Sequence, residues 1–374
     1  MPGAAGEPSP GHPARPCDRA HNLLDLIGGY MPAFLIKAAL RLDIPDRLGD
    51  SAMTGAELAA ATQTHRPSLT RTLRALAAID VLSEVEPDRF RLTPRGQLLR
   101  PGVPGSLWRH AQIMLDQTMW RAWPELEHSV RTGKRAFDEV VGTDYFSHTG
   151  YDEDPANRSG LWDLIHQIMI EDTRSAAEAV LRSYDFARFS TVVDVAGGSG
   201  TLVAAVLAAH PAQRGIVFDR PEGIENTPGA LARAGVADRC EVRTGDFLVD
   251  VPEGGDLYLI KSAIFNLHED GDVRTLLRNV RRVVPDHGRL LVIEEILPAR
   301  VGAPTPAATY LDDVNTMVNL GGRLRTEDEH RALLADAGFT TVAITALPEG
   351  RHVYHSVLEA APRAAASTAS TMPT

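Results

Sequence analysis

The residues best placed to do chemistry in this 374-residue sequence follow one short β-prone stretch. From Ser190 the chain reads STVVDVAGGSG and continues into an alanine-rich helical run, with Asp194 ahead of Gly197, Gly198 and Gly200. Glycine is needed where the backbone turns sharply and approaches a ligand closely, because a Cβ would block the approach. The pattern predicts a strand, a ligand-binding turn and a helix, the opening unit of a doubly wound sheet.

Further polar residues stand at the ends of the next predicted strands. The stretch GIVFD ends in Asp219, about 20 residues beyond the last glycine, the spacing of a carboxylate that binds a ribose hydroxyl. The stretch CEVRTG ends in Asp246 and Phe247, where an adenine would lie, and DLYLIK ends in Lys261. Because the carboxyl ends of parallel strands share one edge of a sheet, we expect these side chains to gather there.

The amino-acid sequence of the turn distinguishes between two cofactors that bind with this geometry. It begins at an acidic residue, Asp194, and reads D-V-A-G-G-S-G rather than the G-x-G-x-x-G of dinucleotide-binding proteins. This pattern favours S-adenosylmethionine (SAM) over NAD. We therefore predict an α/β, Rossmann-like SAM-binding domain with a seven-stranded sheet over residues 186–361.

A mainly helical domain is predicted ahead of it, over residues 21–105. Residues 23–48 keep apolar side chains at helical spacing, although Pro32 should break or kink the helix after one or two turns. This apolar face is too extensive for one short domain to cover, which predicts a homodimer. Thr54 and Glu57 form a capping box that opens the next helix.

A second helix beginning near Ser68 and a hairpin around residues 86–88 complete a winged-helix pattern. Such a unit can bind DNA, but its second helix offers only Arg66, Arg71 and Arg74, and the formal net charge of the chain is -11. Binding to many phosphates needs clustered Lys and Arg. We therefore expect a dimerisation scaffold and no nucleic acid partner, with a DNA-binding or ligand-sensing module as the remaining class.

Residues 106–185 are predicted to link the two domains and to supply the substrate pocket. The segment holds all four tryptophans of the chain and a run of other bulky side chains. Side chains of this kind pack in a core first and line a pocket second. Those expected to face a substrate or the cofactor are Met114, Trp120, Tyr145, Phe146, Trp162, His166 and Met169.

Composition excludes several other classes. Cys17 and Cys240 are far apart, so neither a disulfide framework nor a cysteine metal site is expected. No apolar run has the length of a signal peptide core or a membrane span, which predicts a cytoplasmic protein without a membrane partner. Residues 1–20 and 362–374 are rich in small residues and proline and are predicted to be disordered.

The stretches VVDVAGGSG, GIVFDRPEG, DRCEVRTGDF, LYLIKSAI, GRLLVIEEILP and NLGGRLRT together resemble the small-molecule O-methyltransferase family, from about Asn22 to Leu358. The resemblance implies SAM as cofactor, S-adenosylhomocysteine as product and a small-molecule acceptor. It implies the cofactor-binding residues Asp194, Gly197, Gly198, Gly200, Asp219, Arg220, Asp246, Phe247, Lys261, Ser262 and Met169. It implies the substrate-pocket residues Met114, Trp120, Tyr145, Phe146, Trp162, Phe265, Asn315 and Asn319.

The sequence departs from that family where a proton acceptor is needed. Family members usually carry a histidine base four residues after the strand-ending lysine, and here that position is Phe265. Of the two acidic residues that orient the imidazole, Glu294 is present and Leu324 replaces the other. His268 lies three positions further on and should point elsewhere. The base and one of its two acidic partners are therefore absent, which dismantles the usual deprotonation machinery.

Phe265-Asn266 and GGRLRT resemble the subgroup that contains anthracycline O-methyltransferases and SAM-binding hydroxylases. The leading hypothesis is methylation of a phenolic or similarly activated group on an aromatic or polyketide-like natural product by positioning, with Asn266, Glu294 and His166 as catalytic candidates. C-methylation, in which His166 or Tyr145 would serve, and a SAM-retaining hydroxylase, decarboxylase or cyclase stay open. No metal is expected, because His268 and its acidic neighbours read as a solvated helix cap.

Overall fold

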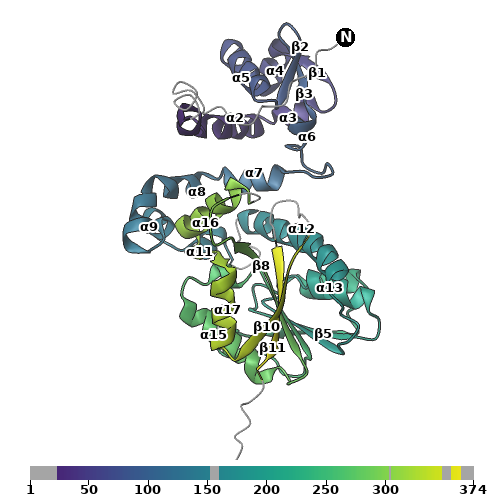
Figure 1. Cartoon of the computed structure of the whole chain (residues 1–374). Coiled ribbons are helices and arrows are strands. Elements are labelled where there is room, and N and C mark those ends of the chain that lie inside the picture. Colours follow the sequence, from purple (N-terminus) through teal and green to yellow (C-terminus); the bar gives the residue numbers. More distant parts are fainter. Residues whose placement is uncertain (1–22, 152–159, 303–304, 348–354, 364–374) are drawn as a thin grey trace, which may run out of the picture. The chain divides into compact units, whose positions relative to one another are not determined.

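The computed structural model describes residues 23–151, 160–302, 305–347 and 355–363, which belong to two compact units (Figure 1). The division falls between Asp116 and Gln117. The boundary predicted from the sequence lay eleven residues earlier, so residues 106–116 belong to the first unit instead of to the linking segment. The predicted disorder at the two ends of the chain lies outside the described residues, apart from Pro362 and Arg363.

The first unit combines short helices with a three-stranded antiparallel sheet in the order β1-β3-β2. Its elements are α2 (Tyr30–Arg41), α3 (Ile44–Leu48), β1 (Ala52–Thr54), α4 (Gly55–Thr62), α5 (Arg66–Ala78), β2 (Leu82–Glu86), β3 (Arg89–Leu92), α6 (Pro94–Gln97) and α7 (Trp108–Met114). The predicted helix pair and hairpin are present as α4, α5 and β2–β3. The second helix begins two residues earlier than predicted, because Pro67 occupies its first turn without needing a backbone N–H partner.

The first apolar stretch breaks at a different residue from the one predicted. Residues 23–27 are helical, residues 28 and 29 form a turn, and α2 then runs on through Pro32. Pro32 is the third residue of α2, where its missing N–H would have no intrahelical acceptor, so it does not interrupt the helix. The predicted capping box is confirmed, since the Glu57 N–H donates to Thr54 Oγ1 and the Thr54 N–H donates to Glu57.

The second unit alternates helices and strands after a helical start. Its helices are α8 (Gln117–Ala122), η1 (Trp123–Glu125), α9 (Leu126–Thr132), α10 (Ala136–Val141), α11 (Tyr145–Thr149), α12 (Gly160–Ser183), α13 (Thr201–Ala209), α14 (Thr227–Arg233), η2 (Ile264–Asn266), α15 (Asp270–Val283), α16 (Ala307–Asn319) and α17 (Glu327–Asp336). No helix among the described residues is both long and apolar enough to cross a membrane.

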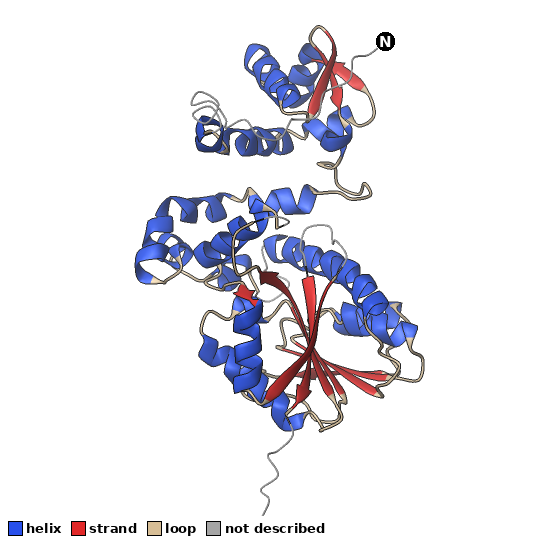
Figure 2. Cartoon of the chain, in the orientation of Figure 1, coloured by secondary structure: helices blue, strands red, loops and turns tan. Residues whose placement is uncertain are grey.

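The strands of the second unit form the predicted doubly wound sheet, with helices on both faces (Figure 2). They are β4 (Thr191–Val195), β5 (Arg214–Asp219), β6 (Cys240–Thr244), β7 (Leu257–Lys261), β8 (Arg289–Leu297), β9 (Arg325–Thr326), β10 (Phe339–Ala346) and β11 (His355–Pro362). Seven of these described strands line up as β10-β11-β8-β7-β4-β5-β6, and the two-residue β9 pairs with β8 beside them. Strands β4, β5, β6, β7 and β8 are parallel to one another. Strand β11 is antiparallel to β8, and β10 is antiparallel to β11.

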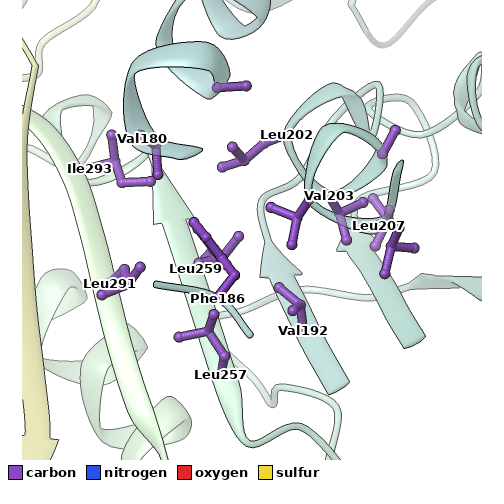
Figure 3. Packing of buried hydrophobic residues seen from close by; sticks show 14 of the residues in the cluster. Val180, Phe186, Val192, Leu202, Val203, Leu207, Leu257, Leu259, Leu291 and Ile293 are labelled. Carbon is purple, nitrogen blue, oxygen red and sulfur yellow. The ribbon is translucent and has the colours of Figure 1, made fainter. Parts of the chain in front are cut away.

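The sheet core divides between two faces because side chains alternate along each strand. In β7, Leu257 and Leu259 pack against α12 and α13, while Tyr258 and Ile260 pack against α15 and α17 (Figure 3 shows the first face). Helices on both faces leave the strand ends as the edge at which a ligand can bind. Since β4 lies between β5 and β7, the chain reverses its strand order at the glycine turn.

Candidate active site at the carboxyl edge of the sheet

The glycine turn after β4 has the shape that its sequence predicted. Gly198 and Gly200 have φ values of 50° and 71°, in the left-handed region that favours glycine. A Cβ on Gly197 would lie 2.9 Å from Asp194 Cγ and 2.9 Å from a methyl of Val217. The turn therefore closes only because glycine occupies these positions.

Asp219 ties the end of β5 to this turn. Its Oδ2 accepts the Gly198 N–H at 2.9 Å, and its Oδ1 accepts the Arg220 N–H at 2.7 Å. Gly223 lies directly beside the carboxylate, where a Cβ would be 2.9 Å from Asp219 Cγ. Burial raises the pKa of Asp219 despite these two donors. The carboxylate is thus fixed at the strand end with acceptor capacity still available on each oxygen.

Two groups of opposite charge lie at neighbouring strand ends, the buried Asp194 and the half-buried Lys261. Asp194 is 2% exposed, and burial, followed by the charge of Asp219, raises its pKa to about 7. Burial lowers the pKa of Lys261, against the opposing influence of Glu294, Asp172 and Asp194. Asp194 and Lys261 therefore influence each other's pKa below the glycine turn.

The residues after Lys261 connect this group to β11. Lys261 Nζ donates to Ser262 Oγ at 3.1 Å, and Ser262 Oγ lies 3.0 Å from His355 Nε2. Burial and the charge of Lys261 lower the pKa of His355 to about 3, so this imidazole is neutral at ordinary pH. The predicted cofactor residues Lys261 and Ser262 therefore belong to one hydrogen-bonded chain.

The other predicted cofactor residues lie further along the same edge. Strand β6 ends at Thr244, so the predicted strand end at Asp246 was two residues too late. The chain already turns there, because Asp246 Oδ1 accepts the Leu248 N–H at 2.8 Å. Phe247 is half-buried, and its carbonyl accepts from Asn279 Nδ2 at 2.8 Å. Met169, on α12, is 49% exposed.

This edge fits the cofactor predicted from the sequence. A Cβ on Gly198 would have no atom within 4 Å, so there is free space beside the turn where a ligand can approach the backbone. Asp219 offers carboxylate acceptors for ribose hydroxyls, and Asp194, whose pKa is raised to about 7, adds a partial negative charge near neutral pH. The donor set and the space agree with a nucleoside that carries a positive charge.

The segment after Lys261 forms the 3₁₀ turn η2, which contains position 265, where the sequence resemblance implies a histidine base. Phe265 occupies that position and cannot accept a proton. Glu294, 2% exposed on β8, accepts the N–H groups of Ala263 and Ile264 at 2.9 and 2.8 Å through one oxygen. Burial raises the pKa of Glu294 to about 7, although the backbone donors and Lys261 favour the charged form. The carboxyl group thus caps the turn.

Asn266, the last residue of η2, lines a cavity of about 450 Å³. Its side-chain amide makes no hydrogen bond within the described residues. The other lining residues come from α9, α10 and the loop between them, from the loop after η2 and from the loop after α16: His128, Gly133, Lys134, Arg135, Asp138, Glu139, His268, Leu320 and Gly321. Asn266 therefore has a free donor and a free acceptor next to open space.

Several predicted pocket residues form one row of aromatic rings. Tyr145 contacts Phe146 at 5.6 Å between ring centroids, Phe146 contacts Tyr151 at 5.8 Å, and Tyr151 contacts Trp162 at 4.7 Å. His166 stacks on Trp162 at 6.0 Å. Tyr145, Trp162 and His166 are each less than 10% exposed, so they act as the packed wall of this region.

The remaining predicted pocket residues have different surroundings. Asn315 Oδ1 accepts from Trp123 Nε1 at 3.1 Å and from Asn319 Nδ2 at 2.9 Å, and Asn319 is fully buried. Trp120 is half-buried on α8. Met114 is 55% exposed on α7 of the first unit.

Sequence reasoning missed the role of Arg325. Its side chain is fully buried and donates to the carbonyls of Ile264 and Leu267 at 3.1 and 2.8 Å, and to Asp270 Oδ1 at 3.0 Å. Asp270 had been interpreted as part of a solvated helix cap. No local pattern predicts a buried arginine, although its place after a pair of glycines, in GGRLRT, could have pointed to it. Within the described residues, no group of His, Cys, Asp or Glu could hold a metal ion.

Comparison with known proteins adds two family matches. Residues 24–101 match the O-methyltransferase dimerisation domain, and residues 123–340 match the O-methyltransferase domain. The two matches correspond in order to the first and the second unit. Together they cover most of the described chain.

Individual relatives agree with these matches. The sequence is 43% identical to O-demethylpuromycin-O-methyltransferase from Streptomyces alboniger, over 91% of this chain and 88% of the relative. It is 32% identical to the aclacinomycin 10-hydroxylase RdmB from Streptomyces purpurascens, over 96% and 98%. The fold is similar to that of the mitomycin 7-O-methyltransferase MmcR, with a TM-score of 0.80, 32% identity and coverage of 92% and 98%.

Proposed function

The chain belongs to the O-methyltransferase family, and we propose that it methylates a phenolic or similarly activated hydroxyl of an aromatic natural product without a histidine base. As a family member it is a SAM-dependent methyltransferase of natural-product biosynthesis. The proposal rests on one observation. The base position holds Phe265, while Glu294, the acid that would orient an imidazole there, accepts backbone N–H groups instead.

The cofactor half of the reaction uses the strand ends. Asp219 is positioned to accept the ribose hydroxyls, and the glycine turn lets the cofactor approach Gly198. Bound SAM supplies an electrophilic methyl group. Asp194 and Lys261 set the charge beneath the turn, and Met169 is available to cover the cofactor from α12.

The acceptor half needs an oxygen that is already a good nucleophile. A phenol with a pKa of about 10 or below exists partly as phenolate, and orientation alone can lower a barrier by roughly 7–11 kcal/mol. The free amide of Asn266 can donate to the acceptor oxygen and hold it in line with the methyl group. The phenol loses its proton to bulk water before it binds, so the phenolate oxygen attacks the methyl group and the sulfur of the cofactor leaves as a neutral thioether. The apolar side chain of Phe265 lies next to Asn266 and takes no part in this proton transfer.

The aromatic row supports an aromatic acceptor. Tyr145, Trp162 and His166 form a buried apolar wall, and the half-buried Phe146 is the member of the row that a planar ring could contact. One relative is named for the methylation of O-demethylpuromycin, which makes that compound the first acceptor to test. We propose that this chain accepts a compound of the same aromatic kind.

We also propose that the enzyme works as a homodimer through the face formed by residues 23–34. Leu23, Leu24, Leu26, Ile27 and Phe34 are each between 44% and 78% exposed, which is unusual for a group of large apolar side chains in water. The face falls within the dimerisation-domain match. Light scattering should give twice the monomer mass, and Leu26→Glu together with Ile27→Glu should give the monomer.

The decisive experiment has a binding arm and a turnover arm. Calorimetry with S-adenosylhomocysteine tests the cofactor site, and mass spectrometry of O-demethylpuromycin and a panel of phenols incubated with SAM tests transfer. We expect binding and a product heavier by one CH₂ group. Binding without any methylated product would instead support the SAM-retaining hydroxylase, decarboxylase or cyclase, and a methyl group on ring carbon would support C-methylation.

A further inference from the structure

The backbone of residues 262–268, which carries Phe265 and Asn266, makes two local hydrogen bonds within its 3₁₀ turn, and its other hydrogen bonds go to groups far away in the sequence. On the donor side, the Ser262 N–H bonds to the Ile293 carbonyl at 3.0 Å, and Glu294 accepts the next two N–H groups, at 2.9 and 2.8 Å. The backbone of Phe265 also contributes to holding Glu294 in its charged form. A single buried carboxyl group therefore fixes the start of the segment.

The carbonyl side of the same segment is bonded to the late loop. The Phe265 carbonyl accepts the Arg323 N–H at 2.9 Å, and a Cβ on Gly322 would lie 2.0 Å from that carbonyl oxygen. Arg325 donates to the carbonyls of Ile264 and Leu267. Glycine is required at position 322 because the two backbones touch there.

The charge of Arg325 is compensated locally. Its buried guanidinium pairs with Asp270 at 3.0 Å, and Asp270 also accepts from Arg323 at 2.8 Å. Arg323 pairs in turn with Glu329 at 3.1 Å. A planar group with five donors in a fixed geometry is suited to hold two carbonyls and a carboxylate at once, which a lysine cannot do.

From these contacts we infer that Glu294 and Arg325 are a pair of positioning residues that clamp residues 263–268 from opposite sides and so hold Asn266 at its cavity. Glu294 acts through its hydrogen-bond acceptor oxygen, not through proton transfer, and Arg325 acts through its donors to the carbonyls. Glu294 and Arg325 thus orient a backbone segment, and no imidazole is present for the acid to orient.

Buried polar backbone groups need partners, and this is why the clamp can control geometry. Removing the Glu294 acceptor leaves two N–H groups without a partner, and the segment must rearrange to find one. Such a rearrangement moves Asn266, and a displacement of about 1 Å at a reacting centre can lower a rate on the order of 100-fold. The contacts of Asp219 with Gly198 and Arg220 do not include Glu294 and should change little.

The test compares variants that separate acceptor capacity from charge. Glu294→Gln keeps an acceptor oxygen and loses the charge, whereas Glu294→Ala loses both. Arg325→Lys keeps the charge opposite Asp270 and loses the planar donor set. Arg281→Lys is the matched control, because Arg281 also donates to backbone carbonyls, those of Gly338 and Arg363, away from the active-site loop.

The readouts include one that needs no acceptor. Hydrogen exchange of peptides covering residues 263–268 is measured by mass spectrometry with S-adenosylhomocysteine bound. We expect exchange at least about tenfold faster in Glu294→Ala and Arg325→Lys, and close to wild type in Glu294→Gln and Arg281→Lys. Unchanged exchange in both Glu294→Ala and Arg325→Lys would overturn the inference.

Kinetics with a phenol that gives product completes the test, and this arm rests on the proposed function. We expect kcat to fall on the order of 100-fold in Glu294→Ala and about tenfold in Arg325→Lys, with KM for SAM within about threefold of wild type. Glu294→Gln should stay within about fivefold. A Gln variant as inactive as the Ala variant would show that the charge of Glu294 matters and would contradict the clamp. If no phenol is methylated, the proposed function fails while hydrogen exchange still decides the clamp.

Discussion

Two regions of the second unit differ in how their residues are held. We call the strand ends at Asp194, Asp219 and Lys261 the cofactor edge, and residues 263–268 the acceptor loop. At the cofactor edge, the turn after β4 bonds to the end of the next strand, as Gly198 does to Asp219. In the acceptor loop, residues 263–268 are bonded to Glu294 and Arg325, which lie 30 and 61 positions from the Ile264 that both contact. The first arrangement follows from neighbouring βα units, and the second needs the finished fold. The comparison suggests that cofactor binding and acceptor chemistry can be altered separately.

The largest expected effect that would sharpen this comparison is at Asp219. Asp219→Asn should raise the dissociation constant of S-adenosylhomocysteine by about 100-fold, because a charged acceptor with two backbone donors and the ribose hydroxyls is replaced by a neutral group. Calorimetry measures the change. The exchange of residues 263–268 in the absence of ligand should stay as in wild type, since no contact of Asp219 reaches that loop among the described residues.

Asp246→Asn provides the matched control for this variant. Asp246 is exposed and accepts only a local N–H at its own loop, so its loss should weaken binding by less than about tenfold. Equal losses in the two variants would mean that Asp219 has no special part in holding the ribose. Faster exchange of the acceptor loop in Asp219→Asn would show that the two regions are coupled.

The cofactor edge could be predicted from the sequence because its signals are local. A β-branched run, glycines and a strand-ending carboxylate each have a physical reason to stand where they do, and Asp194, Asp219 and Lys261 all lie at strand ends in the structure. The helices on both faces of the sheet follow from the same alternation of strands and helices, whereas the antiparallel β10 and β11 were not predicted. The end of β6 was placed two residues too late, since the strand ends at Thr244 and the chain turns from Gly245 onward.

The acceptor loop could not be predicted in the same way. The sequence shows that the histidine is replaced by Phe265, but it does not show that Glu294 turns to backbone N–H groups or that Arg325 is fully buried. Both contacts depend on how β8 and β9 pack beside η2. The pocket residues Asn315 and Asn319 were placed by resemblance, and their bonds to each other and to Trp123 likewise come from tertiary packing.

A medium effect tests the acceptor side of the comparison. Asn266→Ala should lower kcat by about tenfold, because one neutral hydrogen bond to the acceptor oxygen is lost, and should leave the affinity for S-adenosylhomocysteine unchanged. Steady-state kinetics and calorimetry on the same preparation separate the two. The exposed Asn226, at the start of α14, gives a control variant with no expected change in kcat. A loss of cofactor affinity in Asn266→Ala would break the division between the regions.

A smaller effect concerns pH and the buried carboxyl of Glu294. Its folded pKa of about 7 is raised above 4.5, so the folded state holds the proton more tightly than the unfolded state. The stability that this provides is fully present below about pH 4.5 and is lost as the pH rises to about 7. Glu294→Gln cannot titrate, so the Tm difference between the variant and wild type should shift in favour of the variant from pH 5 to pH 8. Parallel Tm curves would mean that Glu294 is charged throughout.

The smallest expected effect comes from restoring the missing base. Phe265→His places an imidazole at the family position, but Glu294 is engaged with two backbone N–H groups and Leu324 stands where the second acid would be, so nothing orients the ring or stabilises its charged form. A well-placed general base contributes about 100-fold or more, whereas this variant should change kcat by less than about threefold at pH 7. Phe265→Leu is the control for the change in side-chain volume. An increase of about 100-fold in Phe265→His alone would show that the acceptor loop is only one substitution away from base catalysis, and that holding the acceptor in place is not what limits the rate.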